Sequence, residues 1–104
     1  MINIPDSHID QYYEMFGTDT FKQIDILQEE CAELIKALSK YKRSFGYSLE
    51  YLDLVKVNES FNNIVEEITH VAISSEIVAK VLNITEEDIN QEIDKRAAVF
   101  NIRK

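Results

Sequence analysis

Residues 28–33 read QEECAE, and this acidic stretch lies inside a long run of apolar residues at helical spacing. In an α-helix, side chains three and four positions apart lie on one face, so Glu30 and Glu33 should point the same way. The apolar residues around them recur at similar intervals, and they are Ile24, Leu27, Cys31, Leu34, Ile35 and Leu38. The stretch therefore predicts a long helix that has one apolar stripe and a pair of carboxylates on one face.

A second acidic stretch, EEITH at residues 66–70, repeats the same spacing with Glu67 and His70. It also lies in a helical pattern, whose predicted core stripe is Ile64, Ile68, Val71, Ala72, Ser75, Val78, Ala79 and Leu82. A separate polar line on this helix, for which exposure to water is one explanation, contains Asn63, Glu67, His70 and Ser74. Two helices that each present a pair of ligating side chains can bind a divalent cation between them.

The composition favours an all-α fold. The chain has 104 residues, which is enough for one domain over residues 1–104 and too few for two. Only 2 Gly and 1 Pro are present, so the many tight turns of an all-β protein are disfavoured. We expect an antiparallel helical bundle of two long helices with shorter N- and C-terminal helices. Because long helices in so short a chain bury their apolar faces incompletely, we expect oligomerisation to complete the bundle.

Charge and cysteine content exclude several classes of function. The net charge of −8 argues against binding to duplex nucleic acid, which requires a clustered basic face. No apolar run is long enough to cross a bilayer, and the N-terminus lacks the pattern of a signal peptide. The single cysteine, Cys31, cannot form an intramolecular disulfide and falls in the apolar stripe, so we expect a buried thiol and a cytoplasmic protein.

Turn and cap residues predict where the first two helices begin and end. The first helix is expected to open after Pro5, with Asp6 or Ser7 as its N-cap, and to run to about Phe16. Gly17 is its expected stop, because glycine accepts the left-handed backbone that ends helices. The first long helix is expected to begin at Thr18 or Thr20 and to reach about residue 43.

Beyond the first long helix, the pattern is less regular. A turn should be followed by a short helix over residues 49–57 with Ser48 as its cap. The second long helix is expected over residues 59–82, with Asn83 as its stop. The last helix is expected over residues 85–100, because it begins with the capping sequence TEED.

Together, the two acidic stretches resemble the signature of the MazG-like nucleotide pyrophosphohydrolases, an all-α family. That signature is Glu-Glu-x-x-Glu followed, on the next helix, by Glu-x-x-Asp. The first part is present in full at residues 29–33, and the second is present at residues 67–70 with His70 in place of the usual aspartate. The flanking sequence from about Phe16 to Arg96 is also similar to the small phage and bacterial members of the family.

The resemblance implies a metal-dependent enzyme that hydrolyses a nucleoside triphosphate (NTP or dNTP) to the monophosphate and pyrophosphate. By position in the motif, the ligands of Mg²⁺ or Mn²⁺ would be Glu30, Glu33, Glu67 and His70. The catalytic carboxylates would be Glu30 and Glu33 together with Glu29, which would help to position the attacking water. Family members commonly form dimers or tetramers, so the resemblance also implies a homodimer or homotetramer.

Cationic and amide side chains are the expected phosphate contacts under this resemblance, and the candidates for substrate binding are Lys36, Lys40, Asn63, Lys95 and Arg96. Lys40 and the neighbouring Lys42 and Arg43 also suit the negative end of a helix dipole, which explains their position without a substrate. Imidazole is a softer ligand than carboxylate, so His70 predicts weaker Mg²⁺ binding and a preference for Mn²⁺ or another transition metal.

Three alternatives remain open. His70 can mark a degenerate site, in which case the chain is a helical dimer that binds a nucleotide or a protein without catalysis. The pattern Glu-x-x-His with a glutamate on a facing helix is also typical of di-iron carboxylate bundles. Finally, the acidic residues can simply form a solvated helix face. The flanking sequence favours the nucleotide enzyme.

Overall fold

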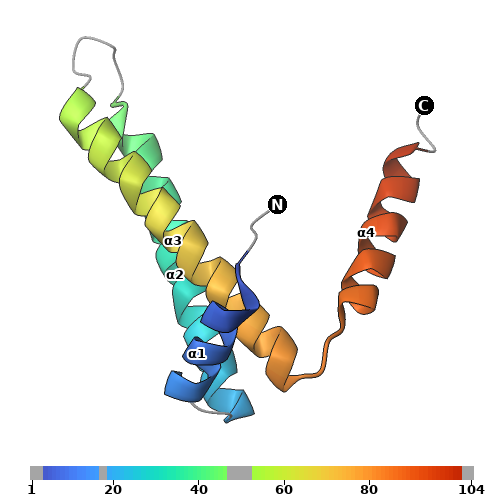
Figure 1. Cartoon of the computed structure of the whole chain (residues 1–104). Coiled ribbons are helices and arrows are strands. Elements are labelled where there is room, and N and C mark those ends of the chain that lie inside the picture. The colour runs from blue at the N-terminus through green and yellow to red at the C-terminus, as the bar shows by residue number, and fades with distance from the viewer. Residues whose placement is uncertain (1–3, 17–18, 47–52, 102–104) are drawn as a thin grey trace.

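The computed structural model describes residues 4–16, 19–46 and 53–101, and all of their regular structure is helical. The helices are α1 (Asp6–Phe16), α2 (Thr20–Ser44), α3 (Leu54–Val81) and α4 (Glu86–Asn101). Two long helices are thus flanked by two shorter terminal ones, which confirms the predicted all-α fold (Figure 1). Within this part of the chain no helix is long and apolar enough to cross a membrane.

The α2/α3 pair is the centre of the molecule. The two helices contain 25 and 28 residues and are therefore about 38 Å and 42 Å long. They run antiparallel and side by side over most of their length (Figure 1). Because the pair is antiparallel, a residue in the middle of α2 faces a residue in the middle of α3, and the two acidic stretches meet.

Aspartate side chains cap both long helices at their N-termini. Asp19 accepts a hydrogen bond from the backbone N–H of Lys22 at 3.1 Å, and α2 begins directly after it at Thr20, one of the two predicted starts. Asp53 accepts from the N–H groups of Val55 and Lys56 at 3.0 and 3.2 Å. These bonds satisfy N–H groups that have no partner inside a helix.

Because Asp53 is the cap, α3 begins earlier in the sequence than predicted. α3 begins at Leu54 and continues without a break, so the prediction of a separate short helix over residues 49–57 is wrong for its described part. The physical reason is that Asp53 provides a strong cap six residues before residue 59, the expected start of the long helix. Ser48, Gly17 and Thr18 lie outside the described residues.

The chain leaves α3 and enters α4 as predicted. Asn83 has a φ of 56°, in the left-handed region that asparagine tolerates better than most residues. The Ile84 N–H donates to the Ala79 carbonyl at 2.8 Å, which completes a common helix-ending motif. Thr85 and Asp88 then cap α4 reciprocally, each side chain accepting from the other's backbone N–H at 3.1 and 2.9 Å.

The terminal helices differ in how they are attached. α1 packs against α3 through the buried Ile9, and the Lys80 ammonium of α3 pairs with Asp10 and lies 4.5 Å from the ring centroid of Tyr13. α4 stands apart from the other helices in Figure 1, and its described side chains are exposed. Its large apolar residues, which face solvent in the single chain, are Ile89, Ile93, Val99 and Phe100.

The face that α2 turns toward α3 is not the predicted apolar stripe. Gln23 and Ala37 are the buried residues of α2, whereas Ile35 is 66% exposed and Leu38 and Cys31 are also exposed. The prediction of a buried Cys31 is therefore wrong in the single chain. Ile24, Leu27 and Leu34 of the predicted stripe are half-buried, and the buried residues of α3 include Ile77 and Val78 as well as two serines.

On α3, too, the buried face differs in part from the predicted core stripe. Ser60 and Ser74 are buried, and they belong to the same side of the helix as the polar line that includes Glu67. The explanation that this line faces water is therefore wrong. Ile68, Ser75 and Leu82, which were predicted to be core residues, are exposed. In contrast, Val78 is buried as expected.

Candidate metal centre

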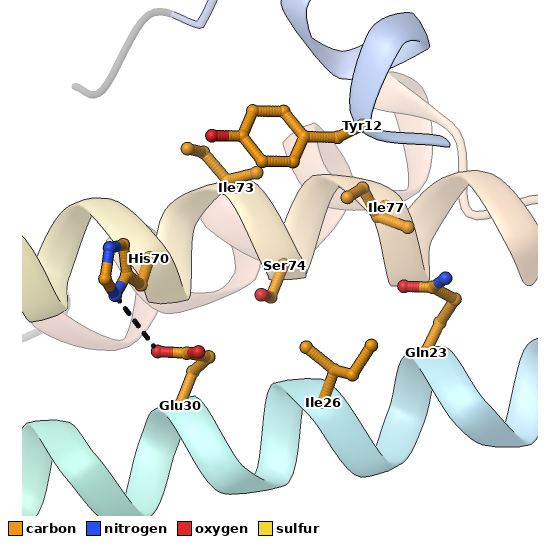
Figure 2. Close-up of a pocket in the computed structure, with 8 residues that line it drawn as sticks. All are labelled: Tyr12, Gln23, Ile26, Glu30, His70, Ile73, Ser74 and Ile77. Carbon is orange, nitrogen blue, oxygen red and sulfur yellow. Dashed lines mark ion pairs between the residues drawn. The ribbon is translucent and has the colours of Figure 1, made fainter. Parts of the chain in front are cut away.

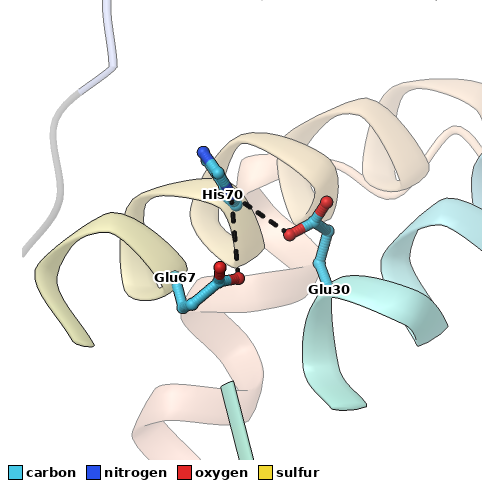
Figure 3. A group of neighbouring side chains, drawn as sticks. All are labelled: Glu30, Glu67 and His70. Atoms are coloured by element: carbon cyan, nitrogen blue, oxygen red, sulfur yellow. Dashed lines mark ion pairs between the residues drawn. The ribbon is translucent and has the colours of Figure 1, made fainter. Parts of the chain in front are cut away.

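Three ligating side chains from the two acidic stretches converge between α2 and α3. The Nδ1 atom of His70 lies 3.3 Å from Oε2 of Glu30 and 3.7 Å from Oε2 of Glu67 (Figure 3). One ligand atom from each of the three residues lies within 4.8 Å of the other two. The sequence predicted this meeting from two spacings alone, and we refer to Glu30, Glu67 and His70 as the acidic cluster.

Burial within the acidic cluster is graded. The side chain of Glu67 is 14% exposed, that of Glu30 is 27% exposed and that of His70 is 43% exposed. The cluster therefore has a closed end against the helix contact and an open end at His70. A small ion can enter from solvent, whereas Glu67 is held in place by the helices around it.

Glu67 has an unsatisfied oxygen. Its Oε2 atom is buried and has no hydrogen-bond partner among the described residues, because the 3.7 Å separation from His70 is too long for a hydrogen bond. A buried carboxylate oxygen without a partner is costly, since it has lost its hydration without replacement. A divalent cation beside Glu67 would supply the missing interaction, so the residues present fit a metal ion.

The electrostatics of Glu67 agree with this geometry. Burial raises the pKa of the Glu67 carboxyl above its ordinary value. His70 opposes the rise, whereas the negative charge of Glu30, a side-chain hydrogen bond between Glu30 and Glu67, and the negative charge of Glu33 add to it. A bound cation would instead lower the pKa of Glu67, because it favours the ionised form of every carboxylate around it.

Two predicted carboxylates lie beside the cluster rather than in it. Glu33, one turn along α2, is exposed and lines a groove of about 350 Å³ with Lys36, Ala37, Lys40, Arg43 and Asn63. Its charge still reaches Glu67, as the pKa of that residue indicates. Glu29 is exposed on α2, and its predicted role in positioning water stays a prediction.

A mostly apolar pocket adjoins the opposite side of the cluster. It has a volume of about 310 Å³ and is lined by Tyr12, Gln23, Ile26, Glu30, His70, Ile73, Ser74 and Ile77 (Figure 2). The ring of Tyr12 comes from α1 and lies near Ile73, while Gln23 and Ile26 come from the first half of α2. Glu30 and His70 form the boundary between the pocket and the cluster.

Sequence reasoning did not identify this pocket. A signal was nevertheless present, because Gln23 lies seven residues before Glu30 and Ser74 lies four after His70. Those intervals place each pair on one face of its helix. The position of Tyr12 had no such signal, since it depends on where α1 docks against α3.

The predicted phosphate contacts divide into two groups. Lys36, Lys40 and Asn63 line the groove that continues from Glu33, so they lie on the same side of the helix pair as the carboxylates. Lys95 and Arg96 are on α4, away from the acidic cluster of the same chain (Figure 1). The Lys95 ammonium lies 3.8 Å from Glu92 of its own helix. The structure thus brings the first group toward the cluster and leaves the second apart.

Comparison of the chain with models of protein families, with curated proteins and with solved structures finds no significant match.

Proposed function

We propose that this protein is a metal-dependent nucleoside triphosphate pyrophosphohydrolase. The reaction would split a nucleoside triphosphate between its α- and β-phosphates and give the monophosphate and pyrophosphate. The observation that carries the proposal is the buried Oε2 of Glu67, which has no hydrogen-bond partner among the described residues and lies beside Glu30 and His70. The resemblance of the two acidic stretches to the MazG-like motif supplies the reaction class.

The ligands of Mg²⁺ or Mn²⁺ in this proposal are Glu30, Glu67 and His70, with Glu33 one turn away. When bound, the cation neutralises charge on the phosphate oxygens and lowers the pKa of a water molecule. One imidazole among carboxylates favours Mn²⁺ over Mg²⁺, because nitrogen is a softer donor than oxygen. Before the cation binds, His70 and Glu30 hold each other through their 3.3 Å contact.

The chain's own residues then have separate tasks. The apolar pocket beside Tyr12 would hold the nucleoside and exclude water from it. Lys36 and Lys40 in the adjoining groove would hold phosphate oxygens. An attacking water would form the new bond to the α-phosphorus as the bond to the β-phosphate oxygen breaks. Glu33, exposed to this groove, would accept the proton of that water, with Glu29 nearby to orient it.

A second copy of the chain is part of the proposal. The apolar side chains of α4 and the flank of α2 at Ile35 are exposed in the single chain, and a homodimer or homotetramer would cover them. The same assembly would allow Lys95 and Arg96 to contact substrate bound to a neighbouring copy. Size-exclusion chromatography with light scattering measures the mass in solution, and a strict monomer would contradict this part of the proposal.

The test of the activity is pyrophosphate release from a panel of ribo- and deoxyribonucleoside triphosphates, with Mg²⁺ and Mn²⁺ compared. Wild type should show metal-dependent turnover, and Glu33→Gln should abolish it. Glu66→Gln is the matched control, because Glu66 is an exposed glutamate on α3 next to Glu67 and outside the cluster. Absence of turnover with every nucleotide and both metals would contradict the proposal.

One observation favours a second candidate, a nucleotide-binding module without catalysis. The His70–Glu30 contact of 3.3 Å places the imidazole where the family motif has a carboxylate, so the cluster has one acidic ligand fewer than that motif. In that case wild type would be inactive, and His70→Asp would gain metal-dependent turnover. Iron-dependent visible absorbance would instead support a di-iron carboxylate site.

A further inference from the structure

A second polar pocket lies at the far end of the α2/α3 groove, where α2 ends and α3 begins. It has a volume of about 580 Å³ and is lined by Lys40, Arg43, Ser44, Lys56, Glu59, Ser60 and Asn63. Both helices contribute to it, so its shape is fixed by the packing of α2 against α3. Ser60 at its base is buried, whereas the three cationic residues are exposed.

Positive charge gathers in this pocket without a matching set of carboxylates. Lys40, Arg43 and Lys56 line it, and Glu59 is the acidic residue among the described side chains around it. None of the three cations forms an ion pair with any carboxylate of residues 4–16, 19–46 or 53–101. In a chain of net charge −8, three cations that no described carboxylate pairs with, gathered around one cavity, are an arrangement that an anion would stabilise.

Lys56 lies at a helix terminus that disfavours a cation. Lys40 and Arg43 lie near the C-terminal end of α2, where the helix dipole favours cations. Lys56 is in the first turn of α3, where the dipole favours anions and where an acidic residue is typical. Helix electrostatics therefore account for the first two cations and oppose the third.

The pocket is separate from the acidic cluster. Along α2, Arg43 lies about 20 Å from Glu30 at the rise of an α-helix. That separation is too large for one triphosphate bound at Glu30 to reach Arg43 and Lys56 as well. Lys40, Arg43 and Asn63 also line the groove that continues from Glu33, so the pocket is the end of that groove farthest from the cluster. A ligand held by Arg43 and Lys56 does not contact the cation that the cluster would hold.

We propose that this pocket binds a small oligophosphate anion without a metal ion. Arg43 offers a planar pair of donors that matches two phosphate oxygens, and the two lysines add point charges from both helices. The ligand is either free pyrophosphate or the phosphate tail of a nucleotide, since both present the same oxygens. The site goes beyond the proposed activity, because neither a cation nor turnover is needed for it.

The test is calorimetric titration of the full chain with pyrophosphate in EDTA, so that no cation can bridge the anion to the carboxylates. Binding should weaken as the salt concentration rises. Arg43→Gln and Lys56→Gln should each weaken it about tenfold or more, because each removes a charge-assisted hydrogen bond. Lys22→Gln is the matched control, since Lys22 is an exposed lysine of α2 at the opposite end, and it should leave binding unchanged.

Glu67→Gln separates this proposal from the proposed enzyme. It should leave metal-free pyrophosphate binding intact even if it abolishes turnover. Titration with a nucleoside triphosphate in EDTA then identifies the source of the anion: tighter binding than pyrophosphate indicates a nucleotide tail, and weaker binding indicates free pyrophosphate. No binding of pyrophosphate in EDTA, or binding that Arg43→Gln and Lys56→Gln leave unchanged, would overturn the proposal.

Discussion

Glu67→Gln is expected to stabilise the metal-free protein, although it removes a residue of the candidate site. The carboxylate of Glu67 has a buried oxygen without a hydrogen-bond partner and has its pKa raised mainly by burial. The neutral amide has nearly the same shape and carries no charge to desolvate. The substitution removes the cost of burying the charge, so we expect a gain on the order of 1 kcal/mol in the free energy of unfolding at neutral pH.

The sign of the pH dependence follows from the direction of the pKa shift. Because the folded state raises the pKa of Glu67, it binds the proton more tightly than the unfolded state does. The wild-type chain therefore loses stability as the pH rises from the ordinary glutamate pKa through the raised folded value. The advantage of Glu67→Gln should be present at pH 7 and should shrink as the pH falls toward about 4.

Thermal unfolding followed by circular dichroism measures the effect. A gain of about 1 kcal/mol corresponds to about 4–8 °C in Tm for a chain of this size class. In EDTA at pH 7 the variant should melt above wild type. Saturating Mn²⁺ should reverse the order, because a cation at one hundred times its Kd adds about 2.7 kcal/mol to wild type alone. A variant that melts lower than wild type in EDTA would refute the reasoning, and so would a wild-type Tm that Mn²⁺ leaves unchanged.

Three further predictions concern the helix termini. Asp53→Ala should lower the free energy of unfolding by about 1 kcal/mol in urea titrations, because two N–H groups of α3 lose their acceptor; an unchanged midpoint would contradict that cap. Lys56→Glu should raise stability by about 0.5 kcal/mol in the same assay while abolishing pyrophosphate binding, since it places an anion at a helix N-terminus. The hydrogen bonds with Thr85 lower the pKa of Asp88, so its contribution to α4 is present at neutral pH and is lost as the pH falls through that lowered value. Asp88→Asn should remove this acid sensitivity from the amide exchange of α4, and an exchange profile equal to wild type at low and neutral pH would contradict it.

The sequence predicted the elements and the cluster because both depend on local spacing. Three of the four predicted ligands, Glu30, Glu67 and His70, lie together, because Glu67 and His70 share one helix face and the helices are antiparallel, whereas Glu33 lies one turn away. The capping sequence at Thr85 and the stop at Asn83 were also readable, because caps act over three or four residues. The cap and the stop depend on residues that are close in the sequence and do not depend on which helices pack together.

The sequence failed where the answer depended on packing. Hydrophobic periodicity identified the most apolar stripe of α2, yet the buried residues of α2 are Gln23 and Ala37, and those of α3 include Ser60 and Ser74 beside Ile77 and Val78. Small residues allow two helices to approach closely, and periodicity gives them little weight. Cys31 and Ile35 were therefore placed in a core that a single chain does not form.

Metal binding at the acidic cluster is the central claim, and titration of the nucleotide-free protein with Mn²⁺ tests it most directly. Electron paramagnetic resonance counts the free ion, and wild type should remove Mn²⁺ from solution at one site per chain. Glu67→Gln should abolish that site, and the matched control Glu66→Gln should preserve it. Equal Mn²⁺ binding by all three proteins would show that Glu67 holds no cation and would contradict the account.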